Sequence, residues 1–239
     1  MNTHHKESHI KQMFTGIANK YDLVNTCISL GRYSYWCRHF AKATLSHHQA
    51  TPQNILDLCC GTASITQALL EEMSKQALPT PSIDCVDFCP EMLKLAQHKL
   101  YENSAFLRFI RANAVDLPFP DNSYDIVSLA YGIRNIPDRK KALQEIFRIL
   151  RPHGTISILE VARPNTAYSP LLRLYLRFFI PLIGGLLTRQ WKTYTYFGSS
   201  IYNFSHSELI EELQNTGFHS ITFSSQNLGL LHTIQAKKL

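Results

Sequence analysis

The strongest constraint on the fold is an alternation of strand-like and helix-like segments between residues 54 and 161. Short apolar runs that predict strands recur five times, and the segments between them carry apolar residues at helical spacing. The predicted strands cover residues 54–58, 83–87, 107–111, 124–130 and 155–161. This alternation is typical of a parallel sheet that is covered by helices on both faces.

The end of the chain continues the sheet. A helical pattern at residues 206–215 is followed by two strand-like runs, at 221–225 and 230–236. Two strands separated by a short turn predict an antiparallel hairpin. We therefore predict a single α/β domain over residues 1–239. Its sheet is doubly wound, seven-stranded and mostly parallel, with a terminal antiparallel hairpin.

Two segments lie outside this alternation. Residues 10–45 have helical spacing, and we interpret residues 1–50 as an N-terminal helical cap. Residues 165–200 are apolar, aromatic and basic, and we interpret them as a lid inserted before the last helix. Their most apolar part, residues 171–187, is interrupted by two arginines and a proline. This favours a helix that lies on a membrane or lines an apolar pocket over one that spans a membrane.

The net charge of +6 is unevenly distributed. Residues 1–50 carry six Lys and Arg against two acids, and residues 151–200 carry six against one. Such basic flanks indicate contact with membrane headgroups or nucleic acid, and ordinary solvated side chains are the alternative. The first residues lack the apolar core of a signal peptide. We therefore expect a cytoplasmic protein with peripheral contact to the inner face of an anionic membrane.

The turn after the first predicted strand carries the features of a ligand site. Doubly wound sheets bind ligands at the carboxyl ends of their strands. Here the turn reads DLCCGTAS, from Asp57 to Ser64, and Asp87 ends the second strand 26 residues after Gly61. A carboxylate in that place can accept hydrogen bonds from both hydroxyls of a ribose. A single glycine suits a ligand without a pyrophosphate, such as S-adenosylmethionine.

Other cofactors are disfavoured by motifs that the sequence lacks. A dinucleotide site carries G-x-G-x-x-G and a P-loop carries GK[ST], and neither occurs in this chain. None of the six cysteines belongs to a Cys-x-x-Cys pair, so we expect reduced thiols and no metal site. At this point an ordinary strand–helix turn remains the alternative.

Four stretches resemble the quinone C-methyltransferases that act on demethylmenaquinol and on its ubiquinone-pathway counterpart. They are YDLVNTCISLGRYSYW from Tyr21, NAVDLPFPDNSYD from Asn113, YGIRNIPD from Tyr131 and RILRPHGTISILE from Arg148. The resemblance covers the chain from about residue 10 and is most specific in YGIRNIPD. It implies the Rossmann-like fold of class I S-adenosylmethionine methyltransferases. It also implies methylation of a prenylated quinol, expected to be demethylmenaquinol, with a benzoquinol left open.

The resemblance assigns roles to residues of this chain. Together with Asp57 and Gly61 of the turn, the expected cofactor-binding residues are Thr62, Asp87, Asn113 and Ala114. Arg134 and Asn135 are the expected catalytic residues, one stabilising a phenolate and the other fixing a quinol oxygen. The expected substrate-binding residues are Tyr21, Asp22, Phe178 and Tyr194. The general base is left open among a held water, Asp22 and Tyr21.

This chain departs from the family pattern at several glycine positions. Cys60 and Ala63 stand where the family has glycine in the first turn, and His153 replaces another glycine. A side chain at the first two positions costs a few tenths to about 1 kcal/mol if the backbone needs a positive φ there.

Two other functions remain as hypotheses. The pI of 9.0 motivates a nucleic-acid base methyltransferase. Amino-methylating enzymes of that kind carry [DN]PP[YFW] after the fourth strand, where this chain has YGIRN, so no nucleic-acid partner is expected. The departures from glycine motivate a quinone-binding protein with a degenerate cofactor turn. A homodimer is left open.

Overall fold

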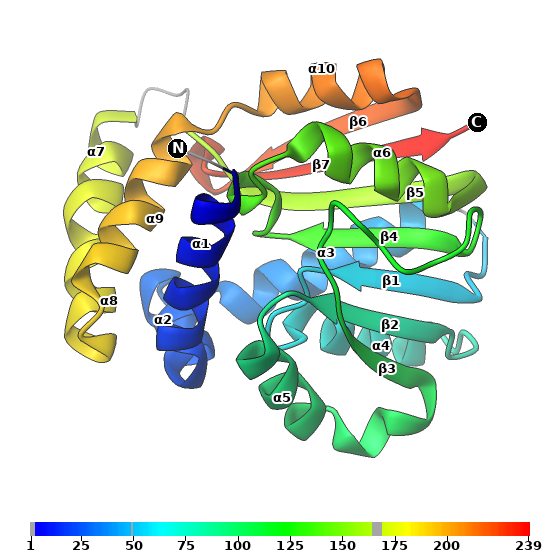
Figure 1. Ribbon diagram of the computed structural model, residues 1–239, viewed down its shortest axis with the longest axis horizontal. Helices are drawn as coiled ribbons and strands as arrows, with labels where there is room; N and C mark the ends of the chain where they lie inside the picture. Colours follow the sequence, from blue (N-terminus) through cyan, green and yellow to red (C-terminus); the bar gives the residue numbers. More distant parts are fainter. Residues whose placement is uncertain (1–2, 49, 164–168) are drawn as a thin grey trace.

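The computed structural model describes residues 3–48, 50–163 and 169–239, and it contains one seven-stranded sheet (Figure 1). The strands are β1 (Asn54–Leu58), β2 (Ser82–Asp87), β3 (Leu107–Arg111), β4 (Tyr124–Ala130), β5 (Leu150–Val161), β6 (Phe218–Gln226) and β7 (Leu231–Lys238). Their order in the sheet is β3-β2-β1-β4-β5-β7-β6. The first five strands are parallel, and β7 runs antiparallel to both β5 and β6. The predicted fold class is confirmed.

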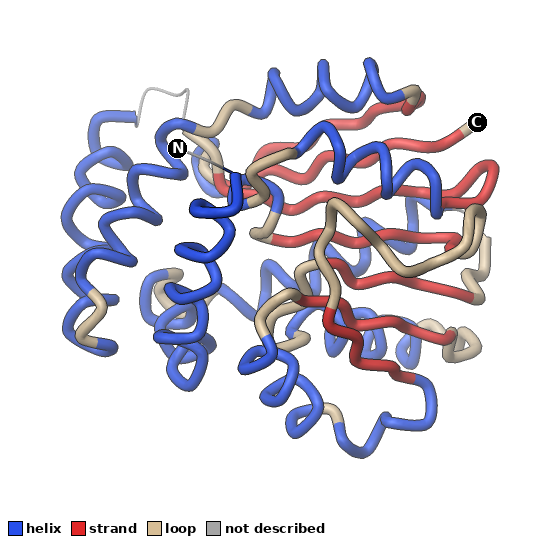
Figure 2. The backbone as a smooth tube through the Cα atoms, in the orientation of Figure 1, coloured by secondary structure: helices blue, strands red, loops and turns tan. Residues whose placement is uncertain are grey.

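Helices connect and cover the strands (Figure 2). They are α1 (Thr3–Ile17), α2 (Tyr21–Ile28), α3 (Tyr33–His48), α4 (Ser64–Lys75), α5 (Pro90–Lys99), α6 (Arg139–Ile149), α7 (Ser169–Leu174), α8 (Ile180–Thr188), α9 (Trp191–Asn203) and α10 (His206–Thr216). A π-helical segment, Tyr175–Phe179, joins α7 to α8. Asp138 caps α6 by accepting from the Lys141 N–H at 3.0 Å.

The sheet separates two apolar cores. One face packs against α3, α4 and α5, and the other packs against α6 and α10. The central strand β1 contributes to both cores, because Ile55 faces one side, Leu56 faces the other, and both are fully buried. Successive side chains of such a strand point to opposite faces, and both faces are buried. A short, continuous apolar run therefore predicts a strand of a parallel sheet.

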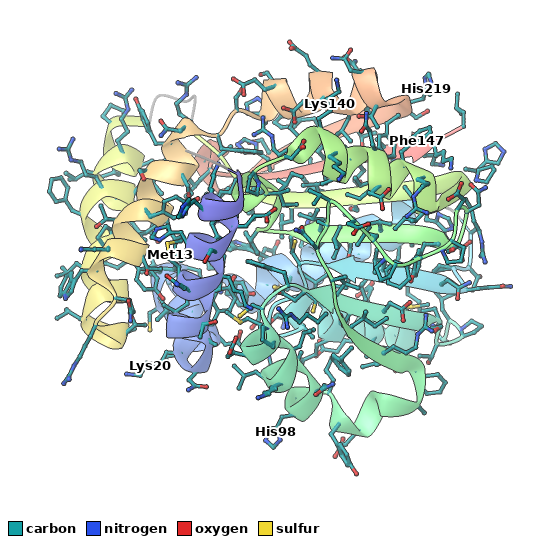
Figure 3. The ribbon with its side chains drawn as sticks, viewed as in Figure 1. Met13, Lys20, His98, Lys140, Phe147 and His219 are labelled. Atoms are coloured by element: carbon teal, nitrogen blue, oxygen red, sulfur yellow. The ribbon has the colours of Figure 1, made fainter. Side chains whose placement is uncertain are left out.

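A third apolar cluster lies beyond the carboxyl ends of the parallel strands. It joins α1 and α2 to α8 and α9, which stand together at that end of the sheet (Figure 1). Met13 of α1 is buried in this cluster, on the side of α1 that faces α9 (Figure 3). The predicted N-terminal cap and the predicted lid therefore pack on each other, next to the predicted ligand site. Residues 165–168 of the lid, and residues 1, 2 and 49 of the cap, lie outside the described residues.

The bounds of β2, β6 and β7 differ from the sequence-based prediction by one to three residues, and two other differences are larger. The helical stretch predicted at residues 10–45 is three helices, with Gly31 at φ +79° in the break before α3. Strand β5 begins at Leu150 instead of residue 155. Its pairing with β4 shifts register after Leu150, and His153 occupies the resulting bulge with φ +64°. Pro152 and Gly154, on either side of His153, therefore lie at a bulge within a longer strand.

Candidate active site

The turn after β1 is built from residues in the left-handed region of backbone space. Cys59, Gly61 and Ala63 have φ of +56°, +55° and +59°. The expectation of a side chain at a positive φ is therefore confirmed at Ala63. It is wrong at Cys60, because the residue with positive φ is its neighbour Cys59. Each non-glycine residue in this region carries a steric cost of roughly 1 kcal/mol.

Asp57 holds this turn in place. Its Oδ2 accepts from the Thr66 hydroxyl at 2.6 Å and from the Thr66 N–H at 3.2 Å, and its Oδ1 accepts from Ser128 at 2.9 Å. Burial raises the pKa of Asp57 to about 6, against the opposing effect of these hydrogen bonds. Both oxygens of Asp57 already have donors within the protein, so this residue ties β1 to α4 and β4. Asp57 was expected from the sequence to contact the cofactor directly, and the structure instead shows it holding the turn.

Asp87 faces the turn from the end of β2. Its Oδ2 accepts from the Gly61 N–H at 2.9 Å, and its Oδ1 accepts from the Cys89 N–H at 2.8 Å. Burial raises the pKa of Asp87 to about 6 as well. The sequence-based placement of this carboxylate beside Gly61 is therefore what the structure shows, and each oxygen retains acceptor capacity.

A cavity of about 80 Å³ opens between these strand ends and the N-terminal helices. Its sheet side is lined by Leu58, Cys59, Gly61, Val86, Asp87, Phe88, Met92, Ala112, Asn113, Ala114, Ala130, Tyr131, Gly132, Asn135, Ile136 and Pro137. Its other side is formed by Glu7, Ile10, Phe14 and Tyr21 of the cap. The lining is mostly apolar with a few polar groups, which is the usual composition of a small-molecule site.

Two predicted cofactor residues lie in the wall of this cavity after β3. Ala114 is buried there, and Asn113 is exposed with its Nδ2 at 3.3 Å from Glu7 Oε1 of the cap. The cap is thus held to the site by a polar contact as well as by Ile10 and Phe14.

Thr62 and Asp22 meet each other outside the cavity lining. Thr62 Oγ1 donates to Asp22 Oδ1 at 2.6 Å, and Lys99 Nζ donates to Asp22 Oδ2 at 2.5 Å. These contacts join α2 to the β1 turn and to α5. Asp22 therefore attaches the cap to the rest of the domain. Neither Asp22 nor Thr62 lines the cavity that contains Asp87.

The segment after β4 contains the predicted catalytic pair. Asn135 lines the cavity, whereas Arg134 lies behind it in a buried ion pair with Glu160 of β5. Arg134 also donates to the Tyr131 carbonyl oxygen at 3.2 Å. Burial raises the pKa of Glu160, against the attraction of the guanidinium. The arginine thus has an acidic partner that sequence reasoning did not assign.

Tyr21 and Tyr131 line the cavity together with Asn135, whose Oδ1 accepts from the Tyr196 hydroxyl at 3.5 Å. Burial raises the pKa of Tyr21 to about 12 and that of Tyr131 well above its ordinary value, so both remain hydrogen-bond donors at neutral pH. The Tyr131 hydroxyl is buried and has no partner among the described residues. Tyr131 and Glu160 were missed as site residues. Both lie inside stretches that carry the family resemblance, which was the signal that could have found them.

The structure does not bring the two lid residues to this cavity. Tyr194 is buried on α9 against Gly184, where an added Cβ would come within 2.2 Å of its ring. Phe178 is 59% exposed on the outer side of the helix. The lid packs against the cap, and the Phe178 side chain points outward, away from the site.

Comparison with known proteins decides the family. The profile of the ubiE/COQ5 methyltransferase family matches residues 2–238. The chain belongs to the ubiE/COQ5 methyltransferase family. The sequence-based prediction of a methyltransferase of this family is thus confirmed.

Curated relatives agree with this family over most of their length. A demethylmenaquinone methyltransferase from Lactiplantibacillus plantarum is 36% identical, and the match covers 92% of each chain. One from Chlamydia caviae is also 36% identical, over 85% of this chain and 84% of the relative.

Solved structures share the fold. A SAM-dependent methyltransferase from Aquifex aeolicus has a TM-score of 0.58 at 15% identity, covering 83% of this chain and 89% of that one. Haemonchus contortus phosphoethanolamine N-methyltransferase 2, in complex with S-adenosylhomocysteine, has a TM-score of 0.60 at 17% identity. That match covers 87% of this chain and 57% of the other.

Proposed function

We propose that this protein uses S-adenosylmethionine to methylate a ring carbon of a prenylated quinol, with demethylmenaquinol as the substrate. The observation that carries the proposal is one cavity shared by the Asp87–Gly61 contact and by Asn135 and Tyr21. A ribose acceptor and donors for a quinol oxygen thus line the same space. The names of the curated relatives support the choice of substrate.

The residues around Asp87 fit the cofactor. Its carboxylate can accept from two ribose hydroxyls, and Val86, Phe88, Met92 and Ala114 provide an apolar slot for a purine ring. S-adenosylmethionine, when bound, supplies a methyl group on a sulfonium. A cavity of about 80 Å³ is small for this ligand, because pockets for such molecules usually measure roughly 300–1,000 Å³. We therefore propose that the cap moves outward when the cofactor enters.

The chain's own residues then have to activate and orient the quinol. Deprotonation of one phenol makes the ring carbon electron-rich. The cofactor, held by the residues around Asp87, would supply the methyl group to that carbon with its sulfur as the leaving atom, and the ring proton would pass to water. Asn135, Tyr21 and Tyr131 can hold the quinol oxygen in the line of attack, and such positioning can supply several kcal/mol of catalysis.

Arg134 keeps an electrostatic role in this proposal. Its charge lowers the pKa of Tyr21 and Tyr131 against the larger effect of burial. It therefore favours negative charge on an oxygen in this part of the cavity. It acts from behind Tyr131, through the segment whose carbonyl oxygen it binds, and is a positioning residue.

The test combines labelled S-adenosylmethionine with a reduced short-chain demethylmenaquinone and the purified protein. We expect the mass of one added methyl on the naphthoquinol ring and slower transfer to a matched benzoquinol. Asn135→Ala should lower turnover while cofactor affinity, measured by isothermal titration, stays near that of the unsubstituted protein. Thr195→Ala, on α9 and outside the lining of the cavity, is the control and should change neither quantity.

Three results would contradict the proposal. Failure to bind S-adenosylmethionine at millimolar concentration would leave a quinone-binding protein with a degenerate cofactor turn. Label appearing only on RNA would support the nucleic-acid methyltransferase. Faster methylation of the benzoquinol would move the enzyme to the ubiquinone pathway.

A further inference from the structure

The continuous helix from α7 to α8 carries an apolar stripe on its outer side. The stripe consists of Leu171, Leu174, Phe178, Leu182 and Leu186, which are between 49% and 64% exposed. Successive members are three or four residues apart, so they share one side of the helix. The helix stands at the outer edge of the molecule, beyond α9 (Figure 1). Exposed apolar side chains gathered in this way mark an interaction site.

The inner side of the same helix is fixed to the domain. Gly184 packs on the ring of Tyr194 and Gly185 packs on Trp191, at distances that leave no room for a Cβ. Residues Pro170–Thr188 are long and apolar enough to cross a membrane by length and composition, but only 22% of this window is buried. A span would have to separate from α9. The geometry therefore favours a helix that stays on the domain and presents its outer side.

A basic groove follows the stripe. It measures about 490 Å³ and lies between this helix and α9, with Arg173 and Arg177 on one side and Ser199 and Asn203 on the other. The Arg173 guanidinium stands 5.9 Å from the centroid of the Tyr202 ring. Within the described part of the chain, neither arginine forms an ion pair. The Ser199 hydroxyl donates to the Tyr196 carbonyl oxygen at 2.8 Å, and the two guanidinium groups beside the Asn203 amide make a suitable site for a phosphate.

The surrounding sequence contains no opposing charge. No Asp or Glu occurs between Glu160 and Glu208, whereas that stretch contains five basic residues. A second copy of this chain would place the same arginines against each other across a two-fold interface, without acids to pair with them. An anionic bilayer supplies both the apolar interior for the stripe and phosphates for the arginines.

We propose that the α7–α8 stripe and its basic groove dock on a bilayer of anionic phospholipids. The leucines and Phe178 enter the boundary between headgroups and acyl chains, and Arg173 and Arg177 bind headgroup phosphates. The purpose of docking rests on the proposed function, since a quinol with an isoprenoid tail is held in a bilayer. The docking itself rests only on this surface, so the two can be tested separately.

The test is co-sedimentation with vesicles of phosphatidylcholine and phosphatidylglycerol in equal parts, beside vesicles of phosphatidylcholine alone. We expect stronger binding to the anionic vesicles, and weaker binding at high salt. Leu174→Gln with Phe178→Gln should weaken binding at least tenfold. Arg173→Gln and Arg177→Gln should each weaken binding to the anionic vesicles by about fivefold, as expected for one charge near such a surface.

The control is Tyr101→Gln with Phe106→Gln, two exposed apolar side chains before β3, at another part of the molecule (Figure 1). This variant should bind as the unsubstituted protein does. Thermal unfolding shows whether each variant is folded, and methylation of a water-soluble short-chain quinol should be equal in all of them. If that activity is absent throughout while vesicle binding follows the predicted order, the proposed function fails and the docking stands.

Other outcomes would overturn the docking proposal. Equal vesicle binding by the stripe variant and the control would show that another surface contacts lipid. Size-exclusion chromatography that shows a dimer, dissolved by the stripe variant without any vesicle binding, would assign the face to a second copy. Competition of vesicle binding by free inorganic phosphate at low millimolar concentration would show a site for soluble anions instead of a bilayer.

Discussion

Asp87 is expected to make stability and cofactor affinity respond to pH in opposite directions. Asp87 is only 7% exposed, and its carboxylate accepts from the N–H groups of Gly61 and Cys89. Burial raises its pKa from 3.8 to about 6. The perturbation is Asp87→Asn, which keeps the shape of the side chain and removes its titration.

The effect on stability follows from linkage. A group with a raised folded-state pKa contributes stability that is fully present below the unfolded pKa of 3.8 and is lost as the pH rises through about 6. Between pH 5 and pH 8 this loss amounts to about 1.4 kcal/mol of the free energy of unfolding. The buried His232, whose lowered pKa of about 4 acts in the opposite direction, changes both proteins equally. The difference between the unsubstituted protein and the variant therefore isolates Asp87.

The effect on affinity has the opposite sign. A protonated Asp87 loses the charge that strengthens its hydrogen bonds to ribose hydroxyls. With a pKa of about 6, roughly one molecule in eleven keeps the charged form at pH 5, so S-adenosylmethionine should bind about tenfold more weakly than at pH 8. Asp87→Asn should bind weakly at both pH values and lose this dependence.

The assays are urea unfolding and isothermal titration with S-adenosylmethionine, each at pH 5 and pH 8. Asp125→Asn is the matched control. Asp125 also accepts from two backbone N–H groups, of Gln53 and Asn54, but lies at the opposite ends of the strands. Although burial opposes it, hydrogen bonds from Asn54 and Arg151 lower the pKa of Asp125. Cofactor affinity that is independent of pH in the unsubstituted protein, or equally changed by Asp125→Asn, would refute the reasoning.

Three further predictions concern stability. Arg134→Met and Glu160→Gln each leave one partner of a buried ion pair alone, so each should lower the free energy of unfolding by about 3–5 kcal/mol; equal urea midpoints would show that the pair is not buried in solution. His153→Gly should raise the free energy of unfolding by roughly 0.5–1 kcal/mol, because this exposed residue has φ +64°. Ala63→Gly should change the free energy of unfolding little, since loss of a buried methyl group offsets the relief of strain. Equal effects of these two variants in denaturant titrations would contradict that difference. Gly198→Ala should lower the melting temperature and cost about 1–3 kcal/mol, because its Cβ would come within 2.5 Å of a carbonyl oxygen of the π-helical segment; an unchanged melting curve would argue against this close packing.

Local sequence pattern was sufficient for the existence and order of the strands and for the placement of Asp87 beside Gly61. The strands 54–58, 107–111 and 124–130 have the predicted bounds. β1 and β4 could be predicted because burial on both faces leaves a mostly apolar run, and that signal does not depend on which neighbour covers each face. The edge strand β3 is only partly buried, and its apolar residues still marked it as a strand. Asp87 and Gly61 could be placed together because the carboxyl ends of neighbouring parallel strands meet at one edge of the sheet.

Only the tertiary structure decided which partner each polar group meets. Arg134 follows a strand end as predicted, but its pairing with Glu160 depends on β4 and β5 being neighbours. Asp22 was expected to contact the substrate, and packing of α2 directs it to Thr62 and Lys99 instead. Helical periodicity groups the side chains of one face but does not say what that face meets, since this is set by contacts distant in sequence.

The helix from α7 to α8 shows the same division most clearly. Its composition by itself determined that it is apolar and basic without acids. Whether Phe178 and Tyr194 face a substrate or something else depended on how α8 packs on α9, through Gly184 and Gly185. That packing buried Tyr194 and left Phe178 in the exposed stripe. The sequence by itself determined the sheet and the chemistry available at its edge, while close packing between distant helices decided which residues face the cavity and which face outward.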